Sequence, residues 1–346
     1  MKSSRGTRCG AKLSVTTVGY YARDRHFQVT CGRKPTLLIS DLSSLRFPIP
    51  IPEEEHEDLG SGEDNMESLL NYVKLHPELL DDVEFVTFRQ VPAYVAEFES
   101  RLEVQAFRHA GRIWIRWNPW PKIKEHVAQR STMRMGEAGA FSRALEASGD
   151  EEKKKKKESS YVKGVFKASM TLPEDPEPTN LLLSGELDGR NAEECHVEVK
   201  VTLLPLDKWF AIRSCRCYWQ CRLGQVPQII LGHIDQNRME FDAYRTWTLE
   251  QFVEEYRRRC GWNVRKPWTV ENGERRIQRM LKSLREHLNE DGASVVLYRG
   301  DKFSRVQPFF TGARHSADGE WSVLEGQQVA DEFKQLVRGV FTSDEK

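Results

Sequence analysis

The sequence predicts a mixed α/β protein. Segments with the apolar pattern of strands alternate along the chain with segments whose apolar residues have helical spacing. The composition, with 39% hydrophobic and 30% charged residues, is that of a globular chain rather than a disordered one. At 346 residues the chain is long enough to bury a sizeable core in one large domain or two modest ones.

The first half of the chain is predicted to begin with a helix over residues 65–80. Its apolar residues recur at helical spacing, and His76-Pro77 marks a break because proline interrupts a helix. Residues 84–98 have a strand or mixed pattern, and residues 102–117 are predicted to form two paired strands. Residues 122–147 lack proline and are rich in helix-forming residues, which predicts a further helix.

The second half alternates strand and helix signals more regularly. Short apolar runs with β-branched residues indicate strands, and longer stretches with apolar residues three and four apart indicate helices. The predicted strands are 181–188, 195–204, 226–234, 293–299 and 305–311, and the predicted helices are 207–223, 248–259 and 273–290.

We predict a single domain over residues 16–335, with flexible residues 1–15 and 336–346 at its two ends. A run of five lysines flanked by glutamates has no apolar periodicity, which predicts a disordered, solvated insertion near residues 149–159. The segment 47–52, in which every second residue is proline, is predicted to be an extended, exposed connector.

Composition and patterning exclude several classes of protein. The 52 acidic residues balance 52 lysines and arginines, so binding of a polyanion would require a local patch of positive charge. No apolar run approaches the roughly 20 residues of a membrane helix, and the first residues lack the apolar core of a secretory signal, so we expect a nuclear or cytoplasmic protein without membrane contact.

Three of the seven cysteines, Cys215, Cys217 and Cys221, lie in one segment, which favours reduced thiols, with a structural zinc site as the alternative.

Two short segments place ionisable groups two residues apart inside apolar stretches. These are Gly185-Glu186-Leu187-Asp188 and Glu198-Val199-Lys200. If they lie on adjacent strands, the polar residues 189–194 are few enough to join them as a hairpin, and three carboxylates then converge with one ammonium group. Carboxylate oxygens are the ligands of Mg²⁺ or Mn²⁺, and a lysine beside the metal can position water or stabilise an oxyanion. The alternative is a hairpin whose charged residues simply face solvent.

With these motifs the chain resembles the DXO family of decapping exoribonucleases and RNA 5′-end pyrophosphohydrolases, whose strands carry a GEhD and then an EhK motif, where h is apolar. Val86-Thr87-Phe88-Arg89 is similar to the V-T-W-R segment of the family, and Tyr218-Trp219-Gln220 is similar to its WxQ-like helix end. The segment 224–232 is similar to the G-V-P strand that follows, and Val18-Gly19-Tyr20-Tyr21 resembles the first strand of the family. The resemblance spans roughly residues 15–310 and is specific only at the motifs.

The resemblance implies two mostly antiparallel or mixed β-sheets flanked by helices, with a restriction-nuclease-like active-site cleft. It implies hydrolysis at RNA 5′ ends that carry incomplete, unmethylated or NAD caps or a triphosphate, with release of pyrophosphate and 5′-to-3′ exonuclease activity. By resemblance, Glu186, Asp188 and Glu198 bind Mg²⁺ or Mn²⁺, and Lys200 lies near the attacking water and the RNA. Family members can also pair with a large exoribonuclease.

The resemblance further implies that Arg89 and Gln220 contact the RNA 5′ end and backbone. The forked guanidinium of an arginine suits a phosphate, and a glutamine amide can orient an oxygen atom or a water molecule. The alternatives are a surface ion pair for Arg89 and, for Gln220, the cap of a core helix.

One motif departs from the family pattern. The family has a G-x-x-x-E helix motif whose glutamate adds a metal ligand, and the best match here runs from Gly136 to Ala140, with alanine in place of that glutamate. Glu137 lies about one helical turn earlier and is a doubtful substitute. Two functions therefore stay open, a hydrolase of reduced activity and an inactive member that binds RNA ends or a partner. A DNA nuclease of the restriction-like class is a third reading.

Overall fold

The computed structural model describes the chain in segments. The described residues are 13–24, 26–38, 41–51, 66–97, 102–117, 141–142, 144–146, 161–171, 177–235, 237, 240–260, 267–299, 321–324 and 326–342. The predicted helix at 122–147, the lysine-rich insertion and the predicted strand at 305–311 lie wholly or mostly outside these residues.

Within the described segments, the larger of two sheets has nine strands and is mixed. Strand β4 runs parallel to both of its neighbours, β6 and β8, and the other neighbouring pairs are antiparallel. In sheet order the strands are β14 (Ser322–Val323), β13 (Ser294–Arg299), β5 (Leu102–His109), β6 (Arg112–Trp117), β4 (Phe85–Phe88), β8 (Pro178–Glu186), β7 (Tyr161–Thr171), β1 (Ser14–Arg23) and β2 (Val29–Cys31).

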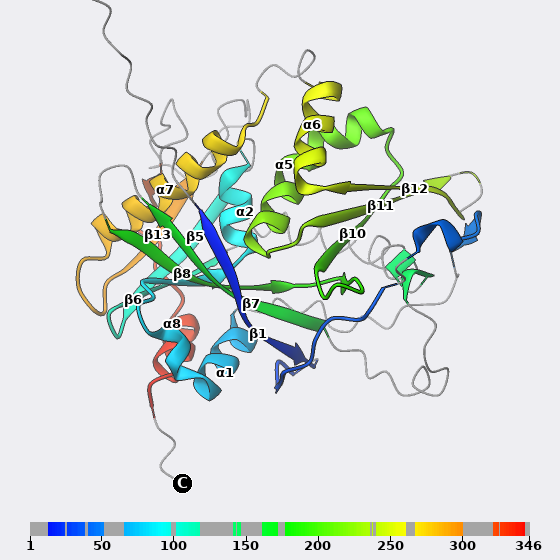
Figure 1. The fold of residues 1–346 in the computed structure, drawn as a ribbon. Coiled ribbons are helices and arrows are strands. Elements are labelled where there is room, and N and C mark those ends of the chain that lie inside the picture. Colours follow the sequence, from blue (N-terminus) through cyan, green and yellow to red (C-terminus); the bar gives the residue numbers. More distant parts are fainter. Residues whose placement is uncertain are drawn as a thin grey trace, which may run out of the picture.

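Helices cover both faces of the nine-stranded sheet (Figure 1). One face packs against the helices α2, α5 and α7, and the other packs against α1 and α8. Among the described residues no helix combines the length and the apolar character needed to cross a membrane. The helices are α1 (Glu67–Leu75), α2 (Gln90–Ala96), α5 (Leu206–Leu223), α6 (Leu249–Cys260), α7 (Val270–His287) and α8 (Asp331–Arg338), with short 3-10 turns at Leu42–Ser44 and Pro77–Leu80.

The smaller sheet has five strands in the part of the chain that the structure describes, and it contains a parallel crossover. Strands β10 and β11 are parallel and are joined by α5, while β12 pairs with β11 in the antiparallel direction. The strands in sheet order are β3 (Ile49–Pro50), β12 (Glu240–Thr248), β11 (Gln228–Asp235), β10 (His196–Thr202) and β9 (Gly189–Arg190). In this β10–α5–β11 unit, α5 packs against the main hydrophobic core, to which strands of both sheets contribute (Figure 1).

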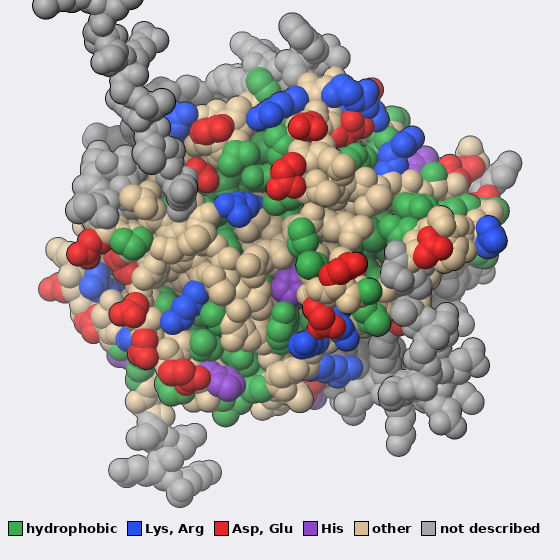
Figure 2. Space-filling view, viewed as in Figure 1, with side chains coloured by type: hydrophobic (Ala, Val, Ile, Leu, Met, Phe, Trp, Pro, Cys, Tyr) green, Lys and Arg blue, Asp and Glu red, His purple; other side chains and the backbone are tan. Residues whose placement is uncertain are grey.

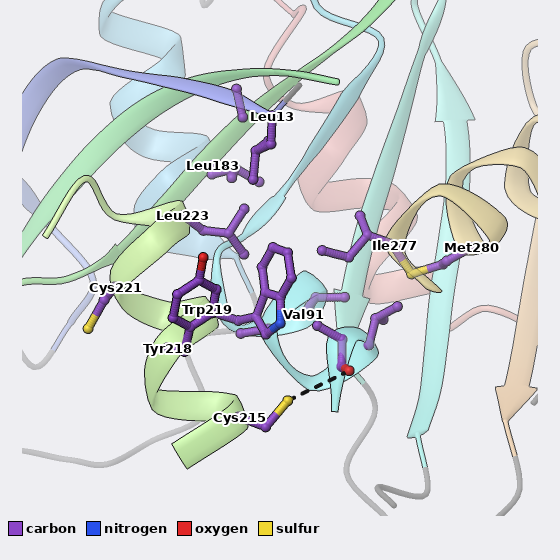
Figure 3. Close-up of a cluster of buried hydrophobic side chains, with 14 of the residues drawn as sticks. Leu13, Val91, Leu183, Cys215, Tyr218, Trp219, Cys221, Leu223, Ile277 and Met280 are labelled. Atoms are coloured by element: carbon purple, nitrogen blue, oxygen red, sulfur yellow. Dashed lines mark hydrogen bonds between the residues drawn. The ribbon is translucent and has the colours of Figure 1, made fainter. Parts of the chain in front are cut away.

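The main core lies between α5, α2 and α7. Trp219 of α5 is fully buried there, beside Val91 of α2 and Ile277 of α7 (Figure 3). Gly273 of α7 allows this contact, because a Cβ atom at that position would overlap the indole of Trp219. Trp209 and Trp247 are buried in the same cluster, so these tryptophans are core residues rather than base-stacking platforms.

Most predicted elements are confirmed in type. The break at His76-Pro77 separates α1 from a 3-10 turn, and residues 102–117 form the antiparallel pair β5 and β6. The predicted mixed fold with two sheets flanked by helices is also confirmed. The sequence pattern does not predict β7, β12 or α8. Helix α8 continues to Arg338, beyond the expected domain end at 335.

The connector predicted at residues 47–52 is attached to the smaller sheet. Ile49 and Pro50 form the strand β3, which pairs with β12, and the ring of Phe47 stacks on Tyr244. Alternate prolines leave Ile49 free to pair and to pack its side chain against the core of that sheet.

Candidate active site

The two motif segments lie on different sheets, so the predicted hairpin between them is wrong. Glu186 ends β8 in the nine-stranded sheet, and Glu198 and Lys200 lie on β10 in the five-stranded sheet. The chain crosses between sheets directly after β8, and the two residues of β9 pair with β10 instead. This crossing still brings Asp188 to β10, where the main-chain N–H of Val199 donates to Asp188 Oδ2 over 2.8 Å.

Lys200 joins the two carboxylates that meet at this crossing. Glu198 and Lys200 share one face of β10 because they are two residues apart, and Lys200 Nζ forms an ion pair with Glu198 Oε1. Lys200 Nζ also lies 3.8 Å from Asp188 Oδ2. The Glu198 side chain is only 2% exposed, whereas those of Lys200 and Asp188 are 32% and 28% exposed. The lysine therefore links a buried carboxylate to one that reaches solvent.

Arg89 approaches Glu198 from the other side and is buried. Its guanidinium donates to Glu198 Oε2 at 3.4 Å, to the main-chain oxygen of Gln220 at 3.1 Å and to the main-chain oxygen of Glu186. The parallel pairing of β4 with β8 sets this position, because the N–H of Arg89 donates to Ser184 O over 2.8 Å. The alternative of a surface ion pair is wrong, since both side chains of this pair are buried.

Two glycines make room for the Arg89 side chain. A Cβ atom at Gly185, the first residue of the GELD motif, would overlap the aliphatic part of Arg89. A Cβ atom at Gly224, just after α5, would overlap its guanidinium. The Arg89 side chain thus passes between β8 and the end of α5. Arg89 therefore contacts both motif segments and the helix that carries Gln220.

Glu186 and Gln220 contribute through their main chains rather than their side chains. Because side chains alternate along a strand, the Glu186 side chain points to the same side of β8 as that of Ser184, whose hydroxyl is hydrogen-bonded to Tyr21. Gly185, between them, faces Arg89 on the opposite side. The Glu186 side chain is exposed and has no hydrogen bond or ion pair with the described residues. Gln220 is half-buried, and its main-chain oxygen accepts from Arg89.

Burial and neighbouring charges shift the pKa values of Asp188, Glu198 and Lys200. Burial, together with the Glu198 carboxylate, raises the pKa of Asp188 to about 6, although Lys200 opposes the shift. Burial also acts to raise the pKa of Glu198, but Lys200 and Arg89 outweigh it and the pKa is lowered. Burial acts to lower the pKa of Lys200, and Glu198 and Asp188 outweigh it, so that pKa is raised. At pH 7 the carboxylates of Asp188 and Glu198 and the ammonium group of Lys200 are therefore ionised.

The surrounding charge is mixed as well. On the face drawn in Figure 2, acidic and basic side chains are interspersed, and the chain as a whole has zero net charge. Of the arginines near Gln220, Arg216 is paired with Glu97 of the segment after α2, and Arg222 donates to the main-chain oxygen of Leu13. Attraction of a polyanion therefore depends on individual side chains at the site.

The donor set suits a divalent cation in type but is incomplete among the described residues. Carboxylate oxygens are hard ligands of the kind that Mg²⁺ and Mn²⁺ prefer, and Asp188 and Glu198 supply them. No group of three His, Cys, Asp or Glu side chains in the described part of the chain could hold a metal ion. Glu137 and Ala140, the positions of the departing motif, lie outside the described residues.

His196 is a neighbour of the site to which sequence reasoning gave no role. Its Nδ1 lies 3.2 Å from the main-chain oxygen of Gly224, and its Nε2 lies 2.9 Å from the hydroxyl of Tyr20. Burial lowers the pKa of His196, so the ring is neutral near pH 7. The signal was available in the strand period, since His196 shares a face of β10 with Glu198.

The cysteines on α5 are buried free thiols. Cys215 donates to the main-chain oxygen of Ala96 (Figure 3), and burial raises its pKa to about 12. Burial also raises the pKa of Cys221. These thiols remain protonated at neutral pH, and the described residues form no metal-binding group around them, so the zinc alternative receives no support.

The fold is similar to that of solved Rai1 and Dxo1 structures. Scheffersomyces stipitis Rai1, in complex with (3′-NADP)+ and calcium ion, matches with a TM-score of 0.67 at 13% identity, over 95% of this chain and 96% of that one. Candida albicans Rai1, in complex with pU5-Mn2+, matches with a TM-score of 0.65 at 13% identity, over 95% and 96%. K. lactis Dxo1, in complex with manganese, matches with a TM-score of 0.59 at 12% identity, over 86% and 92%. No protein-family model and no curated protein sequence matches the chain.

Proposed function

We propose that this chain is a divalent-metal-dependent hydrolase that acts on the 5′ ends of RNA. The observation that carries the proposal is the meeting of Asp188, Glu198 and Lys200 at the crossing between two sheets, in a fold like that of Rai1 and Dxo1. The C. albicans Rai1 structure holds pU5-Mn2+, and the S. stipitis structure holds (3′-NADP)+ with calcium. Both ligands support a phosphate-containing nucleotide as the substrate class.

Each residue of the site has a role in this proposal. Asp188 and Glu198 would hold the metal through their carboxylates, and bound Mg²⁺ or Mn²⁺ would supply a Lewis acid for the phosphate oxygens. Lys200 keeps a proton at Nζ and donates it as a hydrogen bond to an oxygen of the reacting phosphate. Arg89 positions Glu198 and the main chains of Glu186 and Gln220.

The substrates that we propose follow the DXO resemblance. They are RNAs with incomplete or non-canonical caps, including unmethylated and NAD caps, and RNAs with a 5′ triphosphate, from which pyrophosphate is released. Stepwise 5′-to-3′ degradation is a further proposed activity. A nuclear or cytoplasmic location and a large exoribonuclease partner belong to the same proposal, and co-precipitation from a nuclear extract tests the partner.

The direct test is consumption of defined RNA 5′ ends. Purified protein with Mg²⁺ or Mn²⁺ is expected to release the 5′ group from at least one of four RNAs, which carry a triphosphate, an unmethylated cap, an NAD cap or a monophosphate. Products are separated by electrophoresis and mass spectrometry, and a DNA oligonucleotide of the same sequence tests the DNA nuclease alternative. If all four RNAs survive with either metal, the hydrolase proposal is overturned.

A second candidate function is RNA-end binding without hydrolysis. It is favoured by the pairing of Glu198 and Asp188 with Lys200, and by the lack of a three-ligand group among the described residues. Calorimetric titration with Mn²⁺ separates the two functions. Binding by the natural protein that is lost in Asp188→Ala supports a metal site. RNA binding in the absence of any Mn²⁺ binding supports the second candidate.

Metal binding is expected to depend on pH because of Asp188. A metal competes with the proton on this carboxylate, whose pKa is raised to about 6. The affinity for Mn²⁺ should be constant above about pH 7 and fall roughly tenfold per pH unit below about pH 6. Calorimetry between pH 5 and pH 8 measures this, and Asp188→Asn should remove the step. An affinity that stays constant from pH 8 down to pH 5 would contradict the role given to burial.

A further inference from the structure

A small cavity lies on the face of the smaller sheet that also carries Lys200. Its volume is about 240 Å³, and it lies beside the start of α5, at the carboxyl end of the parallel strands β10 and β11. Ligands of α/β crossover units characteristically bind at this end of the strands. The lining residues are Leu206, Leu231, His233, Ala243, Tyr244 and Arg245.

The strand register connects the cavity to the charged site. Lys200 of β10 is directly opposite Leu231 of β11, and Leu231 is opposite Arg245 of β12. Residues in register point to the same side of a sheet, so these three side chains form one row across three strands. Adjacent strands are about 4.8 Å apart, which places the backbone of Arg245 about 10 Å from that of Lys200. The next row along the strands, through His233 and Ala243, forms the other side of the cavity.

The lining has the character of a nucleotide site. Leu206, Leu231 and Ala243 provide an apolar floor. Arg245 is exposed, and no described residue is recorded as its hydrogen-bond or ion-pair partner. His233 Nδ1 lies 2.7 Å from a carboxylate oxygen of Asp242, which leaves the Nε2 atom of His233 for another group.

We propose that this cavity binds a nucleotide unit adjacent to the phosphate held at Lys200, with Arg245 on the phosphate of that unit and the apolar floor against its base or ribose. The volume is below the roughly 300 to 1,000 Å³ of sites that enclose a whole small molecule, so it fits one unit of a longer substrate. The row of residues from Lys200 to Arg245 runs from the charged site to the cavity. This inference rests on the proposed function and adds the location of a second substrate contact.

The test compares binding of short probes to the natural protein and to Arg245→Ala. The probes are 5′-phosphorylated oligouridines of one, two and four nucleotides, and NAD, measured by calorimetry with EDTA present. The change should weaken binding of the two longer oligouridines, or of NAD, about tenfold, because a charged hydrogen bond to phosphate is lost. It should also reduce the salt dependence of oligouridine binding by about one phosphate contact. The single nucleotide, whose phosphate occupies Lys200, should bind equally well to both proteins.

Two further variants control the result. Ala243→Leu fills the cavity without changing charge and should weaken the same probes as Arg245→Ala. Arg257→Ala removes an exposed arginine of α6 that does not line the cavity, and it should leave all affinities within twofold. Thermal melting checks that each variant is folded.

The outcomes separate the two proposals. Weakening confined to the oligouridines assigns the cavity to the RNA body, and weakening confined to NAD assigns it to the cap nucleotide. Equal affinity of the natural protein and Arg245→Ala for every probe overturns the cavity proposal. If the natural protein still consumes RNA in that case, the proposed hydrolase function stands without the cavity. If the natural protein binds no probe and consumes no RNA, both proposals fail.

Discussion

Replacing Glu198 by leucine is expected to lower the free energy of unfolding by about 3–5 kcal/mol, as breaking a buried ion pair on one side does. Glu198 is 2% exposed and is the only carboxylate with which Arg89 is recorded to pair among the described residues. The Arg89 side chain is only 6% exposed, and it packs against Gly185 and Gly224. Lys200 loses a partner as well, but its side chain is 32% exposed and can turn toward solvent. Urea unfolding followed by circular dichroism measures the change.

Two matched variants identify the source of this loss. Asp188→Asn removes the neighbouring, partly exposed carboxylate and should cost less than about 1 kcal/mol, as exposed ion pairs do. The double change Arg89→Leu with Glu198→Leu removes both buried charges and should recover part of the loss of the single variant. A Glu198→Leu protein as stable as the natural one would show that the pair with Arg89 is not maintained in solution.

The elements around the site could be predicted from sequence because their signals are local. The apolar run ending in Ile229-Ile230-Leu231 and the helical stretch before it are long and bounded by turn residues, and both appear as β11 and α5. Strand period likewise placed Glu198 and Lys200 on one face of β10. Strand β12 was not assigned, because its polar exposed residues hide the alternation.

The geometry of the site could not be predicted, because it depends on contacts between distant parts of the chain. Ionisable residues two apart in two segments do not show which sheet each strand joins, so the hairpin was a reasonable but wrong expectation. The burial of Arg89 depends on Gly185 and Gly224, which are far from it in sequence. The crossing after β8 separates the side chain of Glu186 from those of Asp188 and Glu198, although the motif suggests one cluster of three carboxylates.

Changing Lys200 to methionine is expected to reduce RNA 5′-end hydrolysis by roughly 10²–10³-fold, the effect of removing one donor that stabilises transition-state charge. Glu198 keeps its buried pair with Arg89 but loses Lys200, so the melting temperature should fall, and hydrolysis is measured well below it. Lys167→Met is the matched control, because Lys167 lies on β7 and donates to the main-chain oxygen of Asp81, away from the site. Single-turnover cleavage of the RNA that the natural protein consumes measures the effect.

The same variant distinguishes a catalytic lysine from one that only neutralises the carboxylates. Lys200 is within ion-pair distance of both Glu198 and Asp188, so it competes with a metal ion for their oxygens. Its removal should therefore increase the affinity for Mn²⁺, measured at pH 8, which is above the pKa of about 6 of Asp188 in the natural protein. Weaker hydrolysis together with tighter Mn²⁺ binding places Lys200 on the reacting phosphate. Unchanged hydrolysis with tighter metal binding would limit Lys200 to charge compensation, and the transition-state charge would then need another cation.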